Sequence, residues 1–99
     1  MYRRTQTRAL KVGNVCVGGG ACGEFEAAAL AAGCDTFVTS DIKYNQFWDA
    51  RDLGMNLIDA GHFYTENPVC AYIAEKMSLH FPDLVVEISK NHADCMEFA

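Results

Sequence analysis

Short runs with strand character alternate with segments of helical periodicity, and this alternation limits the possible folds more than any other feature of the chain. The strand-like runs are residues 11–17, 36–39, 56–59 and 84–88, and the helix-like segments are residues 24–32, 44–53 and 67–81. An order of β-α-β-α-β-α-β is typical of an α/β fold. We therefore predict a three-layer α/β sandwich in which helices cover a mainly parallel, four-stranded sheet, with the direction of the fourth strand left open.

Glycine and proline mark the ends of the predicted helices. Gly33 and Gly54 follow the first two helical segments, where a left-handed residue commonly ends a helix. Pro68 suits the first turn of the third helix, and Pro82 ends it. These residues place the element boundaries from local chemistry alone.

Three loops of the predicted fold follow strands, at residues 18–23, 40–44 and 61–66. Crossovers between parallel strands are right-handed, so these loops lie at the same edge of the sheet. Ligands of open α/β sheets bind at the carboxyl ends of the strands. We therefore expect the functional residues in these loops.

Length and charge exclude some classes of protein. The 99 residues allow one domain, and a net charge of −5 argues against binding to a phosphate backbone, which needs clustered Lys and Arg. The only basic cluster comprises Arg3, Arg4, Arg8 and Lys11. We interpret residues 1–11 as a solvated basic leader or linker remnant and residues 12–99 as the α/β domain, with no nucleic-acid partner.

The same composition points to a cytoplasmic protein. No apolar run reaches the ~18 residues that a membrane span requires, and the N-terminus lacks the apolar region of a secretory signal. The five cysteines are an odd number without a C-x-x-C pair. We therefore expect neither a disulfide framework nor a zinc ribbon, and interpret most cysteines as small buried apolar residues.

The third loop, Asp59-Ala60-Gly61-His62-Phe63-Tyr64-Thr65-Glu66, holds the best candidate chemistry. His62 at a strand end and Glu66 four residues later offer an imidazole and a carboxylate to one divalent metal ion. This spacing also arises by chance, and Glu66 equally suits the first turn of a helix. From spacing alone, both interpretations stay open.

The other two loops favour structural roles. In Ser40-Asp41-Ile42-Lys43-Tyr44, we expect Asp41 to cap the second helix, with Lys43 and Tyr44 on its first turn. The first loop contains G-x-G-x-x-G at Gly18, Gly20 and Gly23, a dinucleotide-binding pattern. Glu24 and Glu26 lie where a pyrophosphate would sit and would repel it, so we favour an open turn that a ligand or backbone can approach.

The motifs together resemble a known family. C-V-G-G-G at residues 16–20, S-D-I-K-Y at 40–44 and N-L-I-D-A-G-H at 56–62 with Glu66 are similar, in order and spacing, to the C-terminal half of the Nif-three-like dinuclear-metal proteins. These are also called GTP cyclohydrolase I type 2 homologues. The resemblance runs from about residue 12 to residue 88, and D-A-G-H-x-x-x-E is its most specific part.

The resemblance implies a metal site. In that family, the residues matching His62 and Glu66 are ligands of divalent metal ions, with zinc, iron and manganese all compatible with imidazole and carboxylate. Gly19, Gly20, Asp41, Lys43 and Tyr44 would line the rim of the pocket. The remaining ligands, a His-His pair and an aspartate, come from an N-terminal half that this chain lacks. The tail also departs from the family, with His92 and Asp94 in a segment whose role is open.

Three functions follow. The first is part of a metal-dependent hydrolase acting on a nucleotide or similar small molecule, completed by the missing N-terminal half or by further copies in a homo-oligomer. The second is a metal-responsive assembly or partner-binding module without turnover. The third, less favoured, is a nicotinamide dinucleotide-binding domain.

Overall fold

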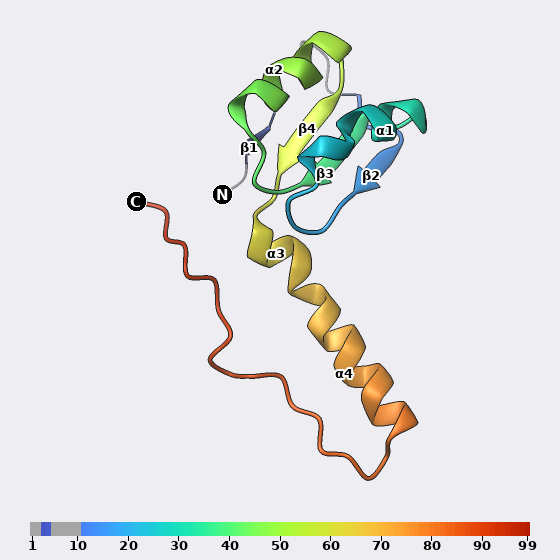
Figure 1. Ribbon diagram of the computed structural model, residues 1–99, viewed down its shortest axis with the longest axis vertical. Helices are drawn as coiled ribbons and strands as arrows, with labels where there is room; N and C mark the ends of the chain where they lie inside the picture. Colours follow the sequence, from blue (N-terminus) through green and yellow to red (C-terminus); the bar gives the residue numbers. More distant parts are fainter. Residues whose placement is uncertain (1–2, 5–10) are drawn as a thin grey trace.

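The computed structural model describes residues 3–4 and 11–99, which contain one four-stranded sheet. Its strands are β1 (Arg3–Arg4), β2 (Val15–Val17), β3 (Thr36–Thr39) and β4 (Asn56–Asp59), in the order β1-β4-β3-β2. β2, β3 and β4 are parallel, and β1 pairs antiparallel with β4 (Figure 1). The predicted α/β class with a mainly parallel sheet is confirmed, and β3 and β4 begin and end where the sequence places them.

The helices follow the glycine and proline signals closely. A 3₁₀ turn, η1 (Gly23–Phe25), leads into α1 (Glu26–Ala31). The helix α2 (Tyr44–Leu53) is capped at its C-terminus by Gly54, which has φ 72°. The chain after β4 forms a short α3 (His62–Glu66) and then α4 (Pro68–His80), which has proline in its first turn. The predicted loop at 61–66 is therefore largely helical.

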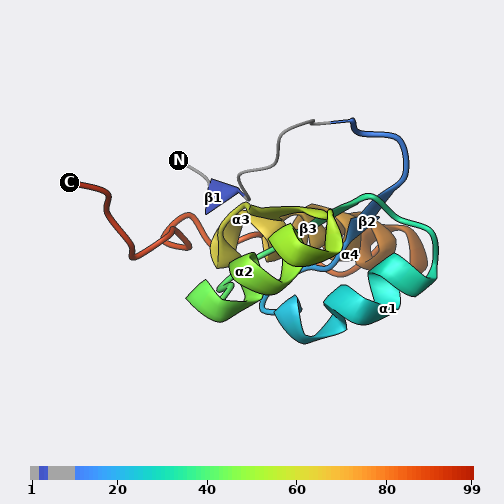
Figure 2. The ribbon, with the colours of Figure 1, turned by 90° about the horizontal axis from the view of Figure 1, so that it is seen from above.

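The core lies between the sheet and two helices on one of its faces. Cys16 on β2, Phe37 on β3 and Leu57 on β4 lie side by side in register, so their side chains share a face. α1 and α2 cover this face with Ala29 and Ala50 (Figure 2). The buried apolar residues of the core are Ala29, Phe37, Ile42, Ala50, Met55 and Leu57.

The predicted fourth strand is wrong. Residues 84–88 have no strand structure, and the fourth strand is instead β1, inside the expected leader. The reason lies in α4, which extends away from the sheet and carries the following segment out of reach of either sheet edge (Figure 1). A segment with strand propensity forms a strand only where a neighbouring strand can pair with its backbone N–H and C=O groups. Arg8, expected in the leader, lies outside the described residues, and the predicted boundary at residue 11 stays a prediction.

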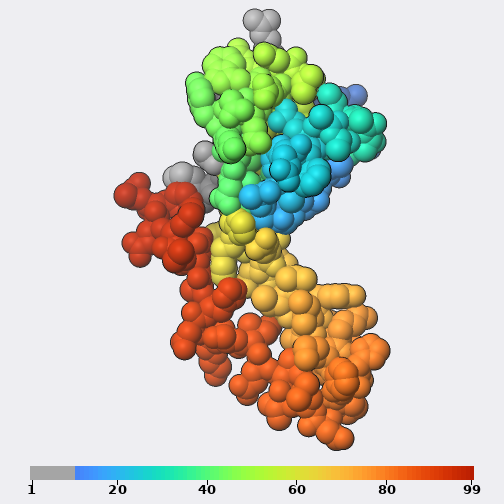
Figure 3. Space-filling model, viewed as in Figure 1, coloured from blue at the N-terminus to red at the C-terminus, as the bar shows by residue number. Residues whose placement is uncertain are grey.

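α4 and the segment after it form an elongated arm, which we define as residues 67–99. No residue after Asp59 is buried, and α4 exposes the apolar face predicted from its periodicity, including Val69, Tyr72 and Ile73. The radius of gyration of 16.7 Å exceeds the about 13 Å typical of a compact domain of this length. In Figure 3 a hollow separates α4 from the returning segment, and Ile73, Met77 and Val86 are among its lining residues. In the described part of the chain, no helix is long and apolar enough to cross a membrane.

Two of the cysteines pair. Cys16 and Cys34 form a disulfide with a Cα–Cα distance of 6.1 Å, whereas Cys22, Cys70 and Cys95 are free. The expectation of no disulfide is therefore wrong for this pair. Its partners come together because the chain returns from α1 beside β2: the backbone N–H of Asp35 donates to the carbonyl of Asn14. The spacing of the cysteines in the sequence does not predict that Cys16 and Cys34 lie close together.

Candidate metal centre

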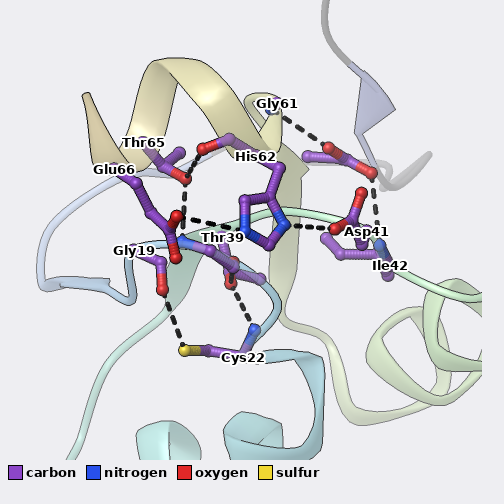
Figure 4. A network of polar contacts seen from close by, with 11 residues as sticks. Gly19, Cys22, Thr39, Asp41, Ile42, Gly61, His62, Thr65 and Glu66 are labelled. Carbon is purple, nitrogen blue, oxygen red and sulfur yellow. Dashed lines mark hydrogen bonds and ion pairs between the residues drawn. The ribbon is translucent and has the colours of Figure 1, made fainter.

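His62 and Glu66 face one another on α3. β4 ends at Asp59, and Gly61, with φ 89°, turns the chain so that α3 begins at His62. Residues four apart lie on one side of a helix. His62 Nε2 and Glu66 Oε2 are accordingly 3.1 Å apart, with side chains 46% and 54% exposed (Figure 4).

Asp41 approaches the other nitrogen of the same imidazole. It lies two residues after β3, in the left-handed region at φ 50°, and its Oδ2 is 2.5 Å from His62 Nδ1 (Figure 4). The hydrogen bond with Asp41, assisted by the charge of Glu66, raises the pKa of His62 above its usual value. His62 thus stands between two carboxylates, one at each ring nitrogen.

Asp59 connects the two loops that carry Asp41 and His62. Its carboxylate is buried, and it accepts hydrogen bonds from the backbone N–H of Ile42 and of Gly61, both at 3.2 Å. Asp59 is opposite Thr39 in the parallel pairing of β3 with β4, so both loops leave the sheet at the same level. One side chain therefore positions both halves of the contact between Asp41 and His62.

The glycine turn after β2 packs against α3. The backbone N–H of Gly20 donates to Thr65 Oγ1 at 2.9 Å, while the Gly20 carbonyl accepts from Thr39 Oγ1 at 2.8 Å. A Cβ on Gly20 would collide with Glu66, and one on Gly19 would lie 3.2 Å from the Thr65 carbonyl oxygen. Glycine is needed here for the close approach, as the open-turn interpretation predicts.

Several backbone donors of this turn, including that of Gly20, bind acceptors within the protein. Gly18 N donates to the Val38 carbonyl and Cys22 N donates to Thr39 Oγ1, each at 2.9 Å. A dinucleotide site of the G-x-G-x-x-G type leaves such N–H groups free for the pyrophosphate. This arrangement counts against the nicotinamide hypothesis.

The structure brings some of the predicted rim residues together and separates others. Gly19, Gly20 and Asp41 lie against α3, whereas Lys43 and Tyr44 belong to the start of α2. The backbone N–H of Lys43 binds Gln46 Oε1 at 2.8 Å, and the Tyr44 ring packs edge-on against Trp48. The expected cap role of Asp41 is wrong, because the N-cap of α2 is Lys43 and the Asp41 carboxylate is turned toward His62.

His62 and Glu66 fit two positions of a metal coordination shell. Ligand atoms about 2.1 Å from a shared ion are about 3.0 Å apart in an octahedral shell and about 3.4 Å apart in a tetrahedral one. The 3.1 Å between Nε2 and Oε2 lies within this range. Among residues 3–4 and 11–99, no group of three or more His, Cys, Asp or Glu side chains is arranged to hold an ion. Asp41 does not add a third ligand, because it lies at the opposite ring nitrogen. The described residues thus offer two candidate ligands at this place, His62 and Glu66.

A hollow adjoins the two candidate ligands on the side of the arm. The C-terminal segment reaches it through His92, whose ring lies 5.0 Å from that of Phe63. The lining residues are His62, Phe63, Glu66, Asn67, Val69, Cys70 and residues 92–96. His92 and Asp94 therefore border the same space as His62 and Glu66.

The sequence interpretation missed the residues that support the site. Thr39 and Thr65 hold the glycine turn, and Asp59 holds the loops. Asp59 was visible within the D-A-G-H motif, but its role as an acceptor for the N–H of Ile42 in another loop, besides that of the nearby Gly61, was not. The threonines carried no signal in one sequence, because threonine is common at the ends of strands.

Comparison with known proteins identifies the family. Residues 2–94 match the Duf34/NIF3 (NGG1p interacting factor 3) family. The chain belongs to the Duf34/NIF3 family. The family resemblance predicted from the sequence motifs is thereby confirmed.

Individual NIF3 relatives are longer than this chain. It is 38% identical over 90 residues to a Nostoc protein named GTP cyclohydrolase 1 type 2 homolog, covering 88% of this chain and 33% of that protein. A Clostridium perfringens protein of the same name is 33% identical over 76 residues, covering 76% of this chain and 29% of the relative. The chain thus spans about a third of the length of these relatives.

Two solved structures match the whole chain, the arm as well as the sheet. Staphylococcus aureus protein SA1388 matches with a TM-score of 0.82 and 25% identity, over 100% of this chain and 33% of that one. A Bacillus cereus protein related to NIF3 matches with a TM-score of 0.79 and 28% identity, over 100% of this chain and 28% of that one. The elongated shape therefore recurs in longer proteins.

Proposed function

We propose that this NIF3 chain contributes His62 and Glu66 to a dinuclear divalent-metal site that serves a hydrolase-type reaction on a nucleotide or similar small molecule. The observation that carries the proposal is the convergence of His62 Nε2 and Glu66 Oε2 within 3.1 Å beside a hollow. Imidazole and carboxylate together are compatible with zinc, iron or manganese. The name of the Nostoc and Clostridium relatives supports a purine nucleotide as the substrate class.

The residues around the site have separate parts in this proposal. A divalent ion would supply the activation of a water molecule by lowering its pKa. His62 and Glu66 would bind the ion, Thr65 and Gly20 would keep α3 against the turn, and the hollow would receive the substrate. Two ligands hold an ion weakly, so the remaining ones would come from another polypeptide segment, either a complementary part of a NIF3 protein or further copies in a homo-oligomer.

The test is the metal content of the purified chain, measured by elemental analysis without chelator in the preparation. Because two ligands hold an ion weakly, the protein is first equilibrated with zinc in excess. We then expect bound metal in the parent protein and its loss in both His62→Ala and Glu66→Ala. His80→Ala is the matched control, because His80 lies at the far end of α4. Metal that persists in both site variants, or disappears equally in the control, would refute the assignment of these ligands.

A second function is supported by a different observation. α4 has no buried residue and exposes apolar side chains along its length, as expected of a surface that meets another polypeptide. A metal-responsive assembly module would use this surface without turnover. Light scattering with and without zinc, combined with a nucleotide hydrolysis assay, distinguishes the two: association without turnover favours the assembly module, and turnover favours the hydrolase.

A further inference from the structure

We propose that Asp41 is a positioning residue that fixes the tautomer and orientation of His62, so that Nδ1 carries the proton and Nε2 faces the metal beside Glu66. The inference rests on the proposed metal site for its functional meaning. Its structural content, which nitrogen of His62 bears the proton, can be tested without metal.

The contacts of the imidazole ring are the first support. Asp41 Oδ2 lies 2.5 Å from Nδ1, whereas Glu66 Oε2 lies 3.1 Å from Nε2. A neutral imidazole has one N–H, so the two carboxylates compete for it. The shorter contact assigns the proton to Nδ1, which leaves the Nε2 lone pair directed toward Glu66 and the adjoining hollow. Metal-binding histidines commonly donate their other N–H to a carboxylate in this way.

The backbone of Asp41 is the second support. Asp41 is the one non-glycine residue with positive φ in the described ranges. Such a conformation costs about 1–2 kcal/mol per residue and persists where the surroundings enforce it. Its neighbours on both sides are held: Ser40 N donates to the Gly20 carbonyl at 3.0 Å, and Ile42 N donates to Asp59 Oδ2 at 3.2 Å. The loop is therefore anchored in the conformation that turns the carboxylate to His62.

The more ordinary roles of such an aspartate do not account for this arrangement. Lys43, not Asp41, is the N-cap of α2. A stabilising ion pair is also a weak explanation, because the two side chains are 51% and 46% exposed and exposed pairs contribute little to stability. Orientation of the ring is the role that uses both the short contact and the strained backbone.

The test compares two variants of Asp41 with the parent protein. Asp41→Gly removes the carboxylate and tolerates positive φ, while Asp41→Asn keeps an oxygen acceptor in a residue that also adopts this conformation. The tautomer of His62 is read from nitrogen-15 chemical shifts of the metal-free protein, at a pH where the ring is neutral. Glu66→Ala serves as the control for the opposite side of the ring.

We expect the Nδ1–H tautomer in the parent, in Asp41→Asn and in Glu66→Ala, and the Nε2–H tautomer in Asp41→Gly. Zinc affinity should fall about 10–100-fold in Asp41→Gly and be largely restored in Asp41→Asn. An Nε2–H tautomer in the parent, or no change in Asp41→Gly, would overturn the inference. So would unchanged zinc affinity in Asp41→Gly when His62→Ala abolishes binding.

The experiment also separates this inference from the proposed function. If the tautomer changes as expected but the parent binds no zinc, the positioning role of Asp41 stands and the metal site proposed for this chain fails. Circular dichroism of both variants confirms that the comparison is made between folded proteins.

Discussion

The sheet body, residues 3–4 and 11–61, and the arm, residues 67–99, contain similar proportions of apolar residues but use them in opposite ways. In the body, Phe37, Met55 and Leu57 are buried between β-strands and two helices. In the arm, Val69, Ile73 and Val85 are exposed. Burial thus depends on the presence of a facing layer: the body contains both layers of its core, and the arm contains one. α3, with His62 and Glu66, lies at the junction between the two regions.

The arm recurs in a longer protein of similar structure. The whole chain, arm included, matches a third of S. aureus protein SA1388 with a TM-score of 0.82. An apolar helix that keeps its place outside the body needs a surface to cover it, since exposed apolar area of this kind costs free energy in water. We therefore expect the body to behave as an independent folding unit and the arm to depend on a partner.

The largest expected effect is a difference in how strongly substitutions of apolar residues in the body and in the arm lower the stability of the protein. Leu57→Ala should lower the free energy of unfolding by about 2–5 kcal/mol, because Leu57 is fully buried. Ile73→Ala in the arm should change it by less than about 1 kcal/mol, because Ile73 is 48% exposed. Urea unfolding followed by circular dichroism measures both. An equally large loss in Ile73→Ala would show that the arm is packed in solution, and dilution would then reveal whether a second copy covers it.

The next effect concerns the disulfide, which lies wholly in the body. Cys16 and Cys34 are 18 residues apart, and a cross-link over such a loop contributes about 3 kcal/mol. Unfolding in the presence of a reductant should therefore require less denaturant. Cys95→Ser in the arm is the matched control and should leave stability unchanged, because Cys95 is free and exposed. A count of five free thiols in the unreduced, denatured protein would contradict the pairing.

A smaller effect tests the junction between body and arm. Gly20 has φ 71° and Gly54 has φ 72°, so an alanine at either position introduces similar backbone strain of about 1–2 kcal/mol. Only the methyl group at Gly20 meets Glu66 and His62, whereas nothing lies within 4 Å of the one at Gly54. Both variants should lose similar stability, and only Gly20→Ala should also lose zinc binding. Equal zinc binding in the two variants would show that the glycine turn does not support the zinc-binding residues.

The smallest effect is the pH dependence of the metal-free protein. The folded-state pKa of His62 is raised, mainly by its hydrogen bond with Asp41. The stabilising contribution is therefore fully present below the unfolded pKa of about 6.5 and is lost as the pH rises through the higher folded value. The difference in unfolding free energy between the parent and His62→Gln should shrink over that range. If the difference in unfolding free energy between the parent and His62→Gln grew with pH, the stabilising role of protonated His62 would be refuted.

Zinc binding should show the opposite dependence on pH. A metal ion binds the neutral imidazole, so protons compete with it and the affinity should fall as the pH falls through the raised pKa of His62. Titration with a zinc-sensitive competitor over this range provides the measurement. Zinc affinity that is independent of pH would argue against His62 as a ligand.

Local signals predicted the body well and the arm poorly. Residues 36–39 and 56–59 form strands because each run pairs with the other through backbone hydrogen bonds. Residues 84–88 have the same strand character in the sequence, but they lie outside the sheet and form no strand. Likewise, the periodicity of α4 predicted its apolar face correctly but could not show whether another layer covers it.

The sequence by itself determined the α/β class, the positions of most helices and strands, the family, and His62 and Glu66 as candidates, because these follow from periodicity, helix-ending residues and short motifs. Only the tertiary structure decided that Asp41 faces His62 rather than capping α2, that Cys16 meets Cys34, and that Asp59 joins two loops. The pairs Asp41–His62, Cys16–Cys34 and Asp59–Ile42 are 21, 18 and 17 positions apart in the chain. Their proximity is created by the parallel crossovers of the sheet, and no local pattern encodes it.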